Sequence, residues 1–252
     1  MSVEGESTPK RSDRSRAKLM PLHSPPFGGG PFPMVSAELL MVEFEAPREE
    51  IERITPKPFT PAPHNRLVAF IGDCSQLPHS LHYHECAILQ TVSYEGREAI
   101  TIPYIWTSTD TALLAGRELY GMPKMLCDED RLNKVNNEVS GKVARGGETM
   151  MRLSMAIQEQ ADPGTIPLGP SFAFVRHIPS PDPEYPAHRQ LIWSELDDFK
   201  MDFCWAGRGW ISMENPLSSG LDALSPSNVS GAWWGRFSWV LDRSKILWEE
   251  KV

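Results

Sequence analysis

One short stretch of the chain, residues 114–125, combines an amine with the backbone constraints that can aim it. Pro123 fixes its own φ and biases the residue before it away from helix, and Gly121 gives the backbone freedom just upstream. We therefore expect a stiff bend that points Lys124 in one direction. An amine held in this way can act as a nucleophile toward a carbonyl carbon.

The amine of Lys124 must lose its proton before it can attack a ketone and form a Schiff base. A free lysine has a pKa near ~10.4, so only roughly 1 amine in 2,500 is neutral at pH 7. Burial disfavours the charged form of an amine. Met122 and Met125 flank the lysine with apolar bulk and predict that it is partly shielded from water. The alternative is a turn lysine whose stem packs on the methionines while its ammonium group stays in solvent.

A second group of polar side chains precedes the lysine. Side chains alternate along a strand, so Tyr83 and Glu85 would share one face, and His82 and His84 the other. A carboxylate on the cavity side can take and return protons beside an imine, which is the role we expect for Glu85. Tyr83 would then hydrogen-bond a substrate carbonyl or carboxylate. The alternative is a surface strand with solvated side chains.

Histidines at 79, 82 and 84 also suggest a metal site. Their spacing is not a standard zinc pattern, and on a strand His79 would lie away from the other two. His82 and His84 cannot share a face with Glu85. We therefore expect no metal at these residues. No other cofactor is expected either.

Turn signals and apolar runs predict that a mostly β (α+β) domain positions these side chains. Glu95-Gly96 indicates a hairpin, and Asn136-Asn137 and Gly146-Gly147 indicate two more within 129–158. We expect strands at 35–45, 66–71, 85–94, 99–106, 172–178, 191–213 and 236–247.

Two helices are expected among these strands. Pro47 opens a short one at 48–54, with acidic residues in its first turn. The other spans 109–120, with Asp110 as its N-cap. The strands read as mostly antiparallel, and closure into a barrel-like body would leave few free edges. The periodicity itself does not separate a barrel from a sandwich.

Length and composition are ordinary for a globular chain. The 252 residues are 40% hydrophobic and 23% charged, with a net charge of -8 that argues against a nucleic-acid partner. Neither a membrane span nor a secretory signal is predicted. The four cysteines have no disulfide or metal spacing, which indicates reduced thiols in a cytoplasmic protein. Residues 1–24 are expected to be a disordered tail, and 25–252 a single catalytic domain.

The segment around the lysine resembles the signature of the acetoacetate decarboxylase superfamily. The signature is carried by Gly-Arg-Glu-Leu at 116–119 and Gly-Met-Pro-Lys at 121–124. Further likenesses are the Gly-Pro-aromatic entry at 30–32, an early core strand at 67–70, Tyr-His-Glu at 83–85 and a final strand near 234–248. The resemblance covers residues 25–252 and is specific only at 114–126.

This resemblance implies a fold, a covalent mechanism and an assembly. In the family the lysine after the proline forms a Schiff base with a keto acid, so Lys124 is the implied nucleophile and Glu85 matches an active-site glutamate. The resemblance also implies a barrel-like antiparallel fold, a homo-oligomer and a cavity that Trp233 helps to line. Arg117 either binds a substrate carboxylate bidentately or props the loop with Glu118.

Three positions depart from the decarboxylase pattern. Decarboxylases of the family carry a second lysine whose charge keeps the first neutral, and Met125 stands at that position here. A family glutamate after the early core strand corresponds to Ile71 when one gap is allowed, and an arginine near the entry corresponds to Ala37. These changes favour an aldolase-dehydratase over a simple acetoacetate decarboxylase.

The sequence therefore predicts a Schiff-base-forming lyase that acts on a small keto acid. The favoured reaction joins a pyruvate-type donor to an aldehyde and eliminates water. Decarboxylation of a β-keto acid such as acetoacetate is the alternative within the family. Two other classes stay open: a non-catalytic protein of this fold that binds a small acid, and a metal-dependent enzyme that uses residues 79–85.

Overall fold

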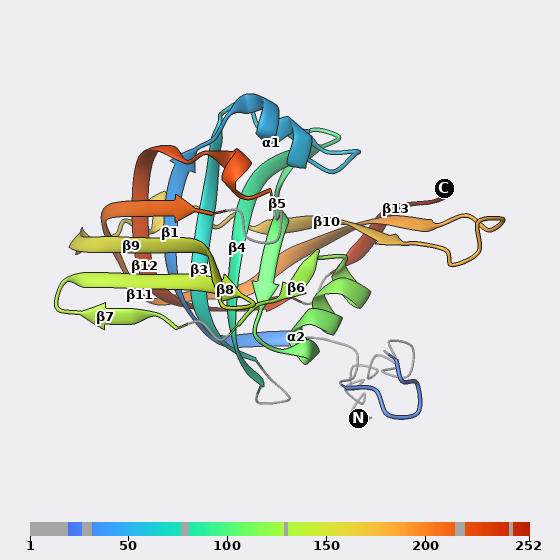
Figure 1. Cartoon of the computed structure of the whole chain (residues 1–252), viewed down its shortest axis with the longest axis horizontal. Helices are drawn as coiled ribbons and strands as arrows, with labels where there is room; N and C mark the ends of the chain where they lie inside the picture. Colours follow the sequence, from blue (N-terminus) through green and yellow to red (C-terminus); the bar gives the residue numbers. More distant parts are fainter. Residues whose placement is uncertain (1–19, 27–31, 77–80, 129–130, 215–219, 242–243) are drawn as a thin grey trace, which may run out of the picture.

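The computed structural model describes residues 20–26, 32–76, 81–128, 131–214, 220–241 and 244–252 (Figure 1). The strands of the N-terminal half are β1 (Phe32–Glu45), β2 (Thr60–Pro61), β3 (Arg66–Gln76), β4 (Leu81–Tyr94), β5 (Arg97–Thr107) and β6 (Lys124–Leu126). Those of the C-terminal half are β7 (Asn133–Val135), β8 (Glu138–Arg145), β9 (Glu148–Gln160), β10 (Ser171–Ile178), β11 (His188–Met213), β12 (Ser227–Leu241) and β13 (Lys245–Lys251). The helical elements are α1 (Arg48–Ile54), α2 (Asp110–Leu114), the π-helix η2 (Ala115–Tyr120) and the 3-10 turns η3 (Pro163–Thr165) and η5 (Asp222–Leu224).

These strands form one 13-stranded sheet, in which ten strands follow the order β10-β5-β4-β3-β1-β12-β11-β9-β8-β7, while β13 pairs with β11, β2 with β4 and β6 with β5. Because β10 also pairs with β11, the strands from β10 round to β11 close into a ring. The pairings are antiparallel except β5 with β6 and β5 with β10. The predicted mostly β fold with few short helices is confirmed. The tail predicted at 1–24 lies largely outside the described residues.

Both faces of the ring strands are buried, each against its own hydrophobic cluster. The inner cluster takes side chains from β1, β3, β4, β5, β10, β11 and β12, for example Leu39, Met41 and Phe174. The outer cluster takes the alternate side chains of β1, such as Leu40 and Val42, together with residues of α1, β8 and β9. Strand alternation therefore separates a ring interior from an outer core, and the ring interior is where a site can form.

The three predicted hairpins are present. Glu95 and Gly96 have φ of 51° and 77° and join β4 to β5, the positive-φ pair that a tight hairpin turn requires. Asn136, with φ of 53°, lies between β7 and β8. Gly146 and Gly147 have φ of 62° and 82° and join β8 to β9.

Two predictions of secondary structure were wrong. The single last strand expected at 236–247 is two strands, β12 and β13, and β12 begins at Ser227 in a stretch rich in serine and glycine. The glycine at 235 lies where backbones approach closely, since a Cβ there would lie 2.7 Å from the carbonyl oxygen of Phe203. In the helix predicted at 109–120, the N-cap is Thr109, whose Oγ1 accepts from the amide of Ala112 at 3.4 Å, and not Asp110.

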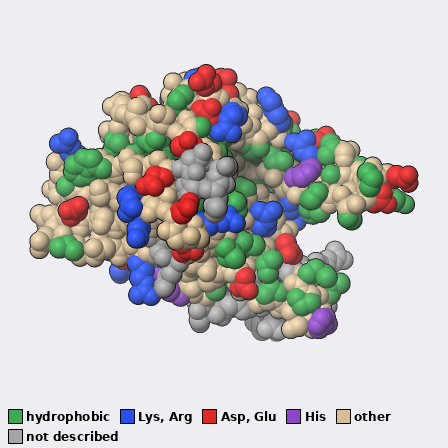
Figure 2. Space-filling model, in the orientation of Figure 1, with side chains coloured by type: hydrophobic (Ala, Val, Ile, Leu, Met, Phe, Trp, Pro, Cys, Tyr) green, Lys and Arg blue, Asp and Glu red, His purple; other side chains and the backbone are tan. Residues whose placement is uncertain are grey.

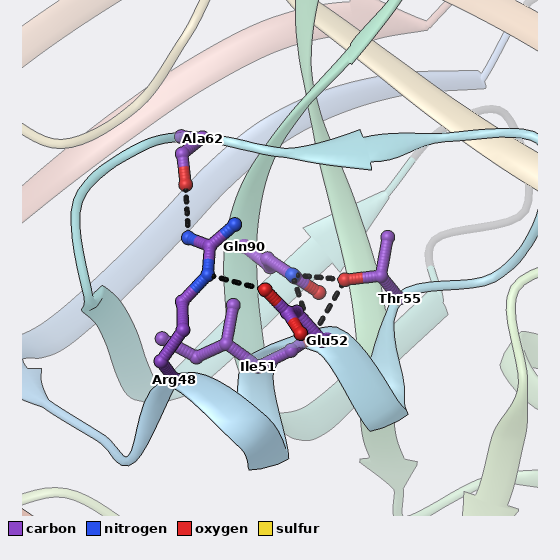
Figure 3. Close-up of polar contacts among 6 residues, drawn as sticks. All are labelled: Arg48, Ile51, Glu52, Thr55, Ala62 and Gln90. Carbon is purple, nitrogen blue, oxygen red and sulfur yellow. Dashed lines mark hydrogen bonds and ion pairs between the residues drawn. The ribbon is translucent and has the colours of Figure 1, made fainter.

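The first predicted helix, α1, is confirmed at its expected bounds and is held to the sheet by buried polar contacts (Figure 3). Gln90 of β4 donates from Nε2 to Oγ1 of Thr55 at 2.7 Å and to the carbonyl of Ile51 at 3.3 Å. The Thr55 hydroxyl also donates to the Ile51 carbonyl, at 2.6 Å. On the exposed side, Arg48 pairs with Glu52 at 2.8 Å.

These contacts predict unequal effects of two truncations. Gln90→Ala removes both hydrogen bonds that Nε2 donates and should lower the free energy of unfolding by about 1–3 kcal/mol, because it leaves buried acceptors with fewer partners. Glu52→Ala, which removes only the exposed ion pair with Arg48, should cost about 1 kcal/mol or less. Urea denaturation measures both, and equal losses would contradict the assignment.

Candidate active site

Lys124 is the first residue of β6, and only 6% of it is exposed. Its backbone pairs in parallel with β5, opposite Ile105, and its amide donates to the carbonyl of Met122 at 2.8 Å. Thus β6 resumes pairing directly after Pro123, and this docking on β5 fixes the direction of the lysine side chain.

The π-helix η2 provides the space for the stem of Lys124. Gly116 faces that stem so closely that a Cβ would lie 2.6 Å from Cδ and 2.7 Å from Cε of the lysine. η2 ends at Gly121, whose φ of 77° favours glycine. Isolated π-helical turns are frequent at functional sites. The glycines of this segment therefore serve the packing of the lysine as well as the turn.

The end of η2 is held from the neighbouring strand by Arg176 of β10. Its guanidinium donates to the carbonyl of Glu118 at 2.7 Å and to that of Leu119 at 3.4 Å. Arg176 also donates to Oε1 of Gln190 on β11. A Cβ on Gly121 would lie 2.5 Å from Cα of Arg176. The turn before the lysine is therefore positioned by the ring itself.

The ammonium of Lys124 forms an ion pair and hydrogen bond with Oε2 of Glu85 on β4. The side chains of the two residues are 7% and 13% exposed. Removing an ammonium and a carboxylate from water is costly unless they are paired. Because a carboxylate is also a proton acceptor, this pair can pass one proton between nitrogen and oxygen.

Tyr83 shares the inner face of β4 with Glu85, as strand alternation predicts. The Lys124 nitrogen lies 5.4 Å from the centre of the Tyr83 ring. Burial raises the pKa of the Tyr83 phenol well above its ordinary value, and the charge of Glu85 raises it further. The hydroxyl therefore remains a hydrogen-bond donor in neutral and mildly alkaline solution.

Lys124, Glu85 and Tyr83 face a cavity of about 100 Å³ inside the ring. Met122 lines the same cavity, as do Cys74 and Gln76 of β3. The rest of the wall is largely aliphatic and aromatic. A small, largely apolar cavity with an amine, a carboxylate and a phenol is suited to hold a small molecule whose carbonyl group faces the amine.

Three residues predicted near the substrate lie outside the described lining of this cavity. Arg117 donates from Nη1 to the carbonyl of Lys124 at 3.0 Å, a contact that suits the propping role. Met125 packs against the outer cluster, with its sulfur 3.4 Å from Nη1 of Arg145. Trp233 lies in the inner cluster and donates from Nε1 to Oγ1 of Thr165 at 3.3 Å.

The histidines of β4 lie on its other face. His84 contacts Oδ1 of Asp73 through Nδ1 at 2.5 Å, and His82 contacts Oγ of Ser75 at 3.1 Å. His79 lies outside the described residues. Among the residues that the structure does describe, no cluster of His, Cys, Asp and Glu is arranged to hold a metal ion.

The positions that depart from the family pattern differ in where they lie. Ile71 is buried in the outer cluster, whereas Phe70 beside it lines the cavity. The correspondence between Ile71 and the family glutamate, which assumed a one-residue gap, stays a prediction. Ala37 is fully buried in the inner cluster.

Several lining residues were not predicted from the sequence. Cys74 and Gln76 follow Phe70 at alternate positions on β3, but the predicted strand stopped at Ile71. Trp239 lines the wall instead of Trp233, because register with β1 places it opposite Met34. Continuing the alternation past 71 would have found the β3 residues; the Trp239 pairing has no local signal.

Alkaline unfolding tests the buried acids of the cavity. Burial raises the pKa of Cys74 well above its ordinary 9.0, helped by the charge of Glu85, so the folded chain keeps this proton when the unfolded chain releases it. Stability should therefore fall as pH rises above about 9, by about 1.4 kcal/mol per pH unit for each such group. Cys74→Ala should remove the contribution of this one thiol to the slope of unfolding free energy against pH, measured by urea titration at several alkaline pH values. An unchanged slope would contradict the burial of this thiol.

In the part of the chain that is described, no helix has the length and apolar composition to cross a membrane.

Comparison with known proteins places this geometry in a family. The family model described as acetoacetate decarboxylase matches residues 19–250. An acetoacetate decarboxylase of Burkholderia cenocepacia is 27% identical over 214 residues, which are 79% of this chain and 81% of that protein.

Two solved structures share the fold at low sequence identity. One, from structural studies of acetoacetate decarboxylase, has a TM-score of 0.81 and 18% identity and covers 95% of this chain and 99% of its own. The other is the enduracididine biosynthesis enzyme MppR complexed with the condensation product of pyruvate and imidazole 4-carboxaldehyde, with a TM-score of 0.80, 19% identity and coverage of 95% and 98%. The fold of this chain is thus about equally similar to the folds of these two structures. From the family match over nearly its whole length, this chain belongs to the acetoacetate decarboxylase family.

Proposed function

We propose that this chain is a Schiff-base-forming lyase that acts on a small keto acid through Lys124. The observation that carries this proposal is the burial of Lys124 beside Glu85 at an apolar cavity. The carboxylate that compensates the ammonium is also positioned to accept its proton. The membership of the family supports the same conclusion.

Imine formation begins when the ammonium of Lys124 passes one proton to Glu85. The neutral amine adds to the keto carbon and forms a C–N bond, while the carbonyl oxygen takes up protons and leaves as water. Ammonium plus ketone therefore gives a protonated imine plus water. The Tyr83 hydroxyl, which stays protonated, can donate a hydrogen bond to the carbonyl oxygen as negative charge develops there.

In the favoured reaction, the iminium of a pyruvate-type acid loses a proton from its methyl carbon to Glu85 and becomes an enamine. The enamine carbon attacks an aldehyde carbon, a C–C bond forms, and the new alkoxide takes a proton. The former methyl carbon then loses a second proton, and the neighbouring carbon, which came from the aldehyde, loses its hydroxyl group. Water is thereby eliminated. Hydrolysis of the imine frees Lys124, so keto acid plus aldehyde gives an unsaturated keto acid plus water.

Two observations favour this reaction over decarboxylation. Position 125, where the decarboxylases of the family carry a second lysine, holds a methionine that packs against the outer cluster. In addition, MppR, which shares the fold, was solved with a condensation product of pyruvate and an aldehyde.

Decarboxylation of a β-keto acid is the second candidate. The curated relative is an acetoacetate decarboxylase, and an apolar cavity weakens the solvation of a substrate carboxylate. Here the C–C bond to the carboxylate breaks, carbon dioxide leaves, and the electron pair enters the Lys124 iminium to give an enamine. A proton then adds to carbon, and hydrolysis releases the ketone.

Reductive trapping tests the imine in both reactions. Incubation with pyruvate, or with acetoacetate, followed by borohydride should add the mass of the reduced adduct to the peptide that contains Lys124. Lys124→Ala, confirmed to be folded, should give none. Release of carbon dioxide and condensation with an aldehyde then separate the two reactions. A folded protein that gives no adduct with either acid would overturn the proposal and favour a protein that only binds small acids.

The close approach of Gly116 gives a second test. Gly116→Ala should slow adduct formation by about tenfold or more, because the added methyl lies within 2.6–2.7 Å of the lysine stem and must displace the amine from Glu85. Gly164→Ala is the matched control, since its Cβ has no neighbour nearer than 3.5 Å. Equal trapping rates for the two folded variants would show that the position of the amine is not critical.

A further inference from the structure

The walls of the cavity indicate which keto acids reach Lys124. Beyond the polar group formed by Lys124, Glu85 and Tyr83, most of the described lining is hydrocarbon or aromatic ring. Burying apolar surface of a ligand against such walls is favourable in proportion to its area. A substrate that places only polar atoms in this cavity would leave most of the wall without a complementary surface.

The apolar wall is built by the paired ends of β1 and β12. Phe32 pairs with Leu241 and Met34 pairs with Trp239, and all four side chains line the cavity. The Phe32 ring also packs edge-on against Tyr120 of η2, with ring centres 6.2 Å apart. Sheet register and ring packing thus hold this wall in place, which makes it a preformed surface for a ligand.

The apolar wall and the amine share one cavity. Lys124 and the four wall residues of β1 and β12 all line this space of about 100 Å³. A chain or ring attached to the carbonyl carbon would therefore contact the β1–β12 wall once that carbon is joined to Lys124.

The charges of the lining residues further restrict which keto acids fit the cavity. Among the described lining residues, the cation is Lys124 and the carboxylate is Glu85, and each is the partner of the other. The iminium and the Tyr83 hydroxyl can serve the carboxylate that every keto acid carries. A second carboxylate at the far end of a substrate would find no second cation among the described lining residues, since Gln76 is neutral and the remaining wall is largely aromatic and aliphatic, and an unpaired charge there is costly.

We propose that the cavity selects substrates whose reacting portion carries an apolar chain or ring and no second charge. This inference rests on the proposed Schiff-base function. In decarboxylation or direct imine formation the apolar group belongs to the keto acid, and in condensation it belongs to the aldehyde and then to the product.

A short keto acid and a pair of longer ones that are equal in length but differ in charge test this selection. The folded protein is incubated with pyruvate, 2-oxohexanoate or 2-oxoadipate, reduced with borohydride, and assayed for the Lys124 adduct as a function of acid concentration. Each methylene buried in the cavity should favour binding by about fourfold at most. The three additional carbons of 2-oxohexanoate would favour binding by about sixtyfold if fully buried, so with partial burial half-maximal trapping should need about tenfold less 2-oxohexanoate than pyruvate. 2-Oxoadipate, which has the same chain length with a terminal carboxylate, should need at least about tenfold more than 2-oxohexanoate.

The wall is tested by a pair of neighbouring substitutions. Trp239→Ala should reduce the preference for 2-oxohexanoate over pyruvate by about fivefold or more, because it removes one side of the apolar wall. Val240→Ala, on the opposite face of β12, should leave the preference unchanged. If Trp239→Ala does not fold, Phe172→Leu at the same cavity replaces it.

The outcomes separate this inference from the proposed function. Trapping of pyruvate or 2-oxoadipate at the same concentrations as 2-oxohexanoate would overturn the selection and leave the Schiff-base chemistry standing. An unchanged preference in a folded Trp239→Ala protein would also overturn it. If none of the acids, acetoacetate included, gives an adduct, the proposed function itself is overturned.

Discussion

The ion pair between Lys124 and Glu85 is the interaction on which the rest of the site depends. Two opposite charges inside a ring of strands are tolerated only because each compensates the other. The arrangement requires an inner face on β4, a docking strand for the lysine and a largely apolar wall. The ring meets these requirements because its strands bury both faces and leave the interior free for a cavity.

Much of this arrangement could be predicted from local patterns. The hairpin dipeptides carry their own backbone preferences, so their positions followed from residue type alone. Strand alternation was sufficient to place Tyr83 and Glu85 on one face and the two histidines on the other. The bend before Lys124 followed from Pro123, because a proline restricts the backbone whatever the remainder of the fold does, whereas the direction of the lysine depends on the docking of β6 on β5.

The features that were not predicted depend on register and on contacts distant in sequence. The predicted strand stopped at Ile71, so Cys74 and Gln76, which continue the cavity face of Phe70, were missed; the extent of β3 is set by its pairing with β1 and β4. Met125 was expected beside the amine because it neighbours Lys124 in sequence, yet successive residues of β6 face opposite ways. The start of β12 was missed because serine and glycine disfavour strands locally, while pairing with β1 and β11 overrides that preference.

The π-helix before the lysine has a consequence for how this segment tolerates changes in length. A π-helical turn holds more residues than an α-helical turn, and here it lies between α2 and a glycine with positive φ that is packed against Arg176. Deletion of one residue within 115–120 would return the turn to α-helical geometry and rotate Gly116 away from the lysine stem. Insertions at the hairpin of Glu95 and Gly96, where a Cβ on the glycine would meet nothing within 4 Å, would be absorbed in solvent. The position of the Lys124 amine is therefore tied to an exact residue count in one short segment, whereas this exposed hairpin tolerates a change in loop length.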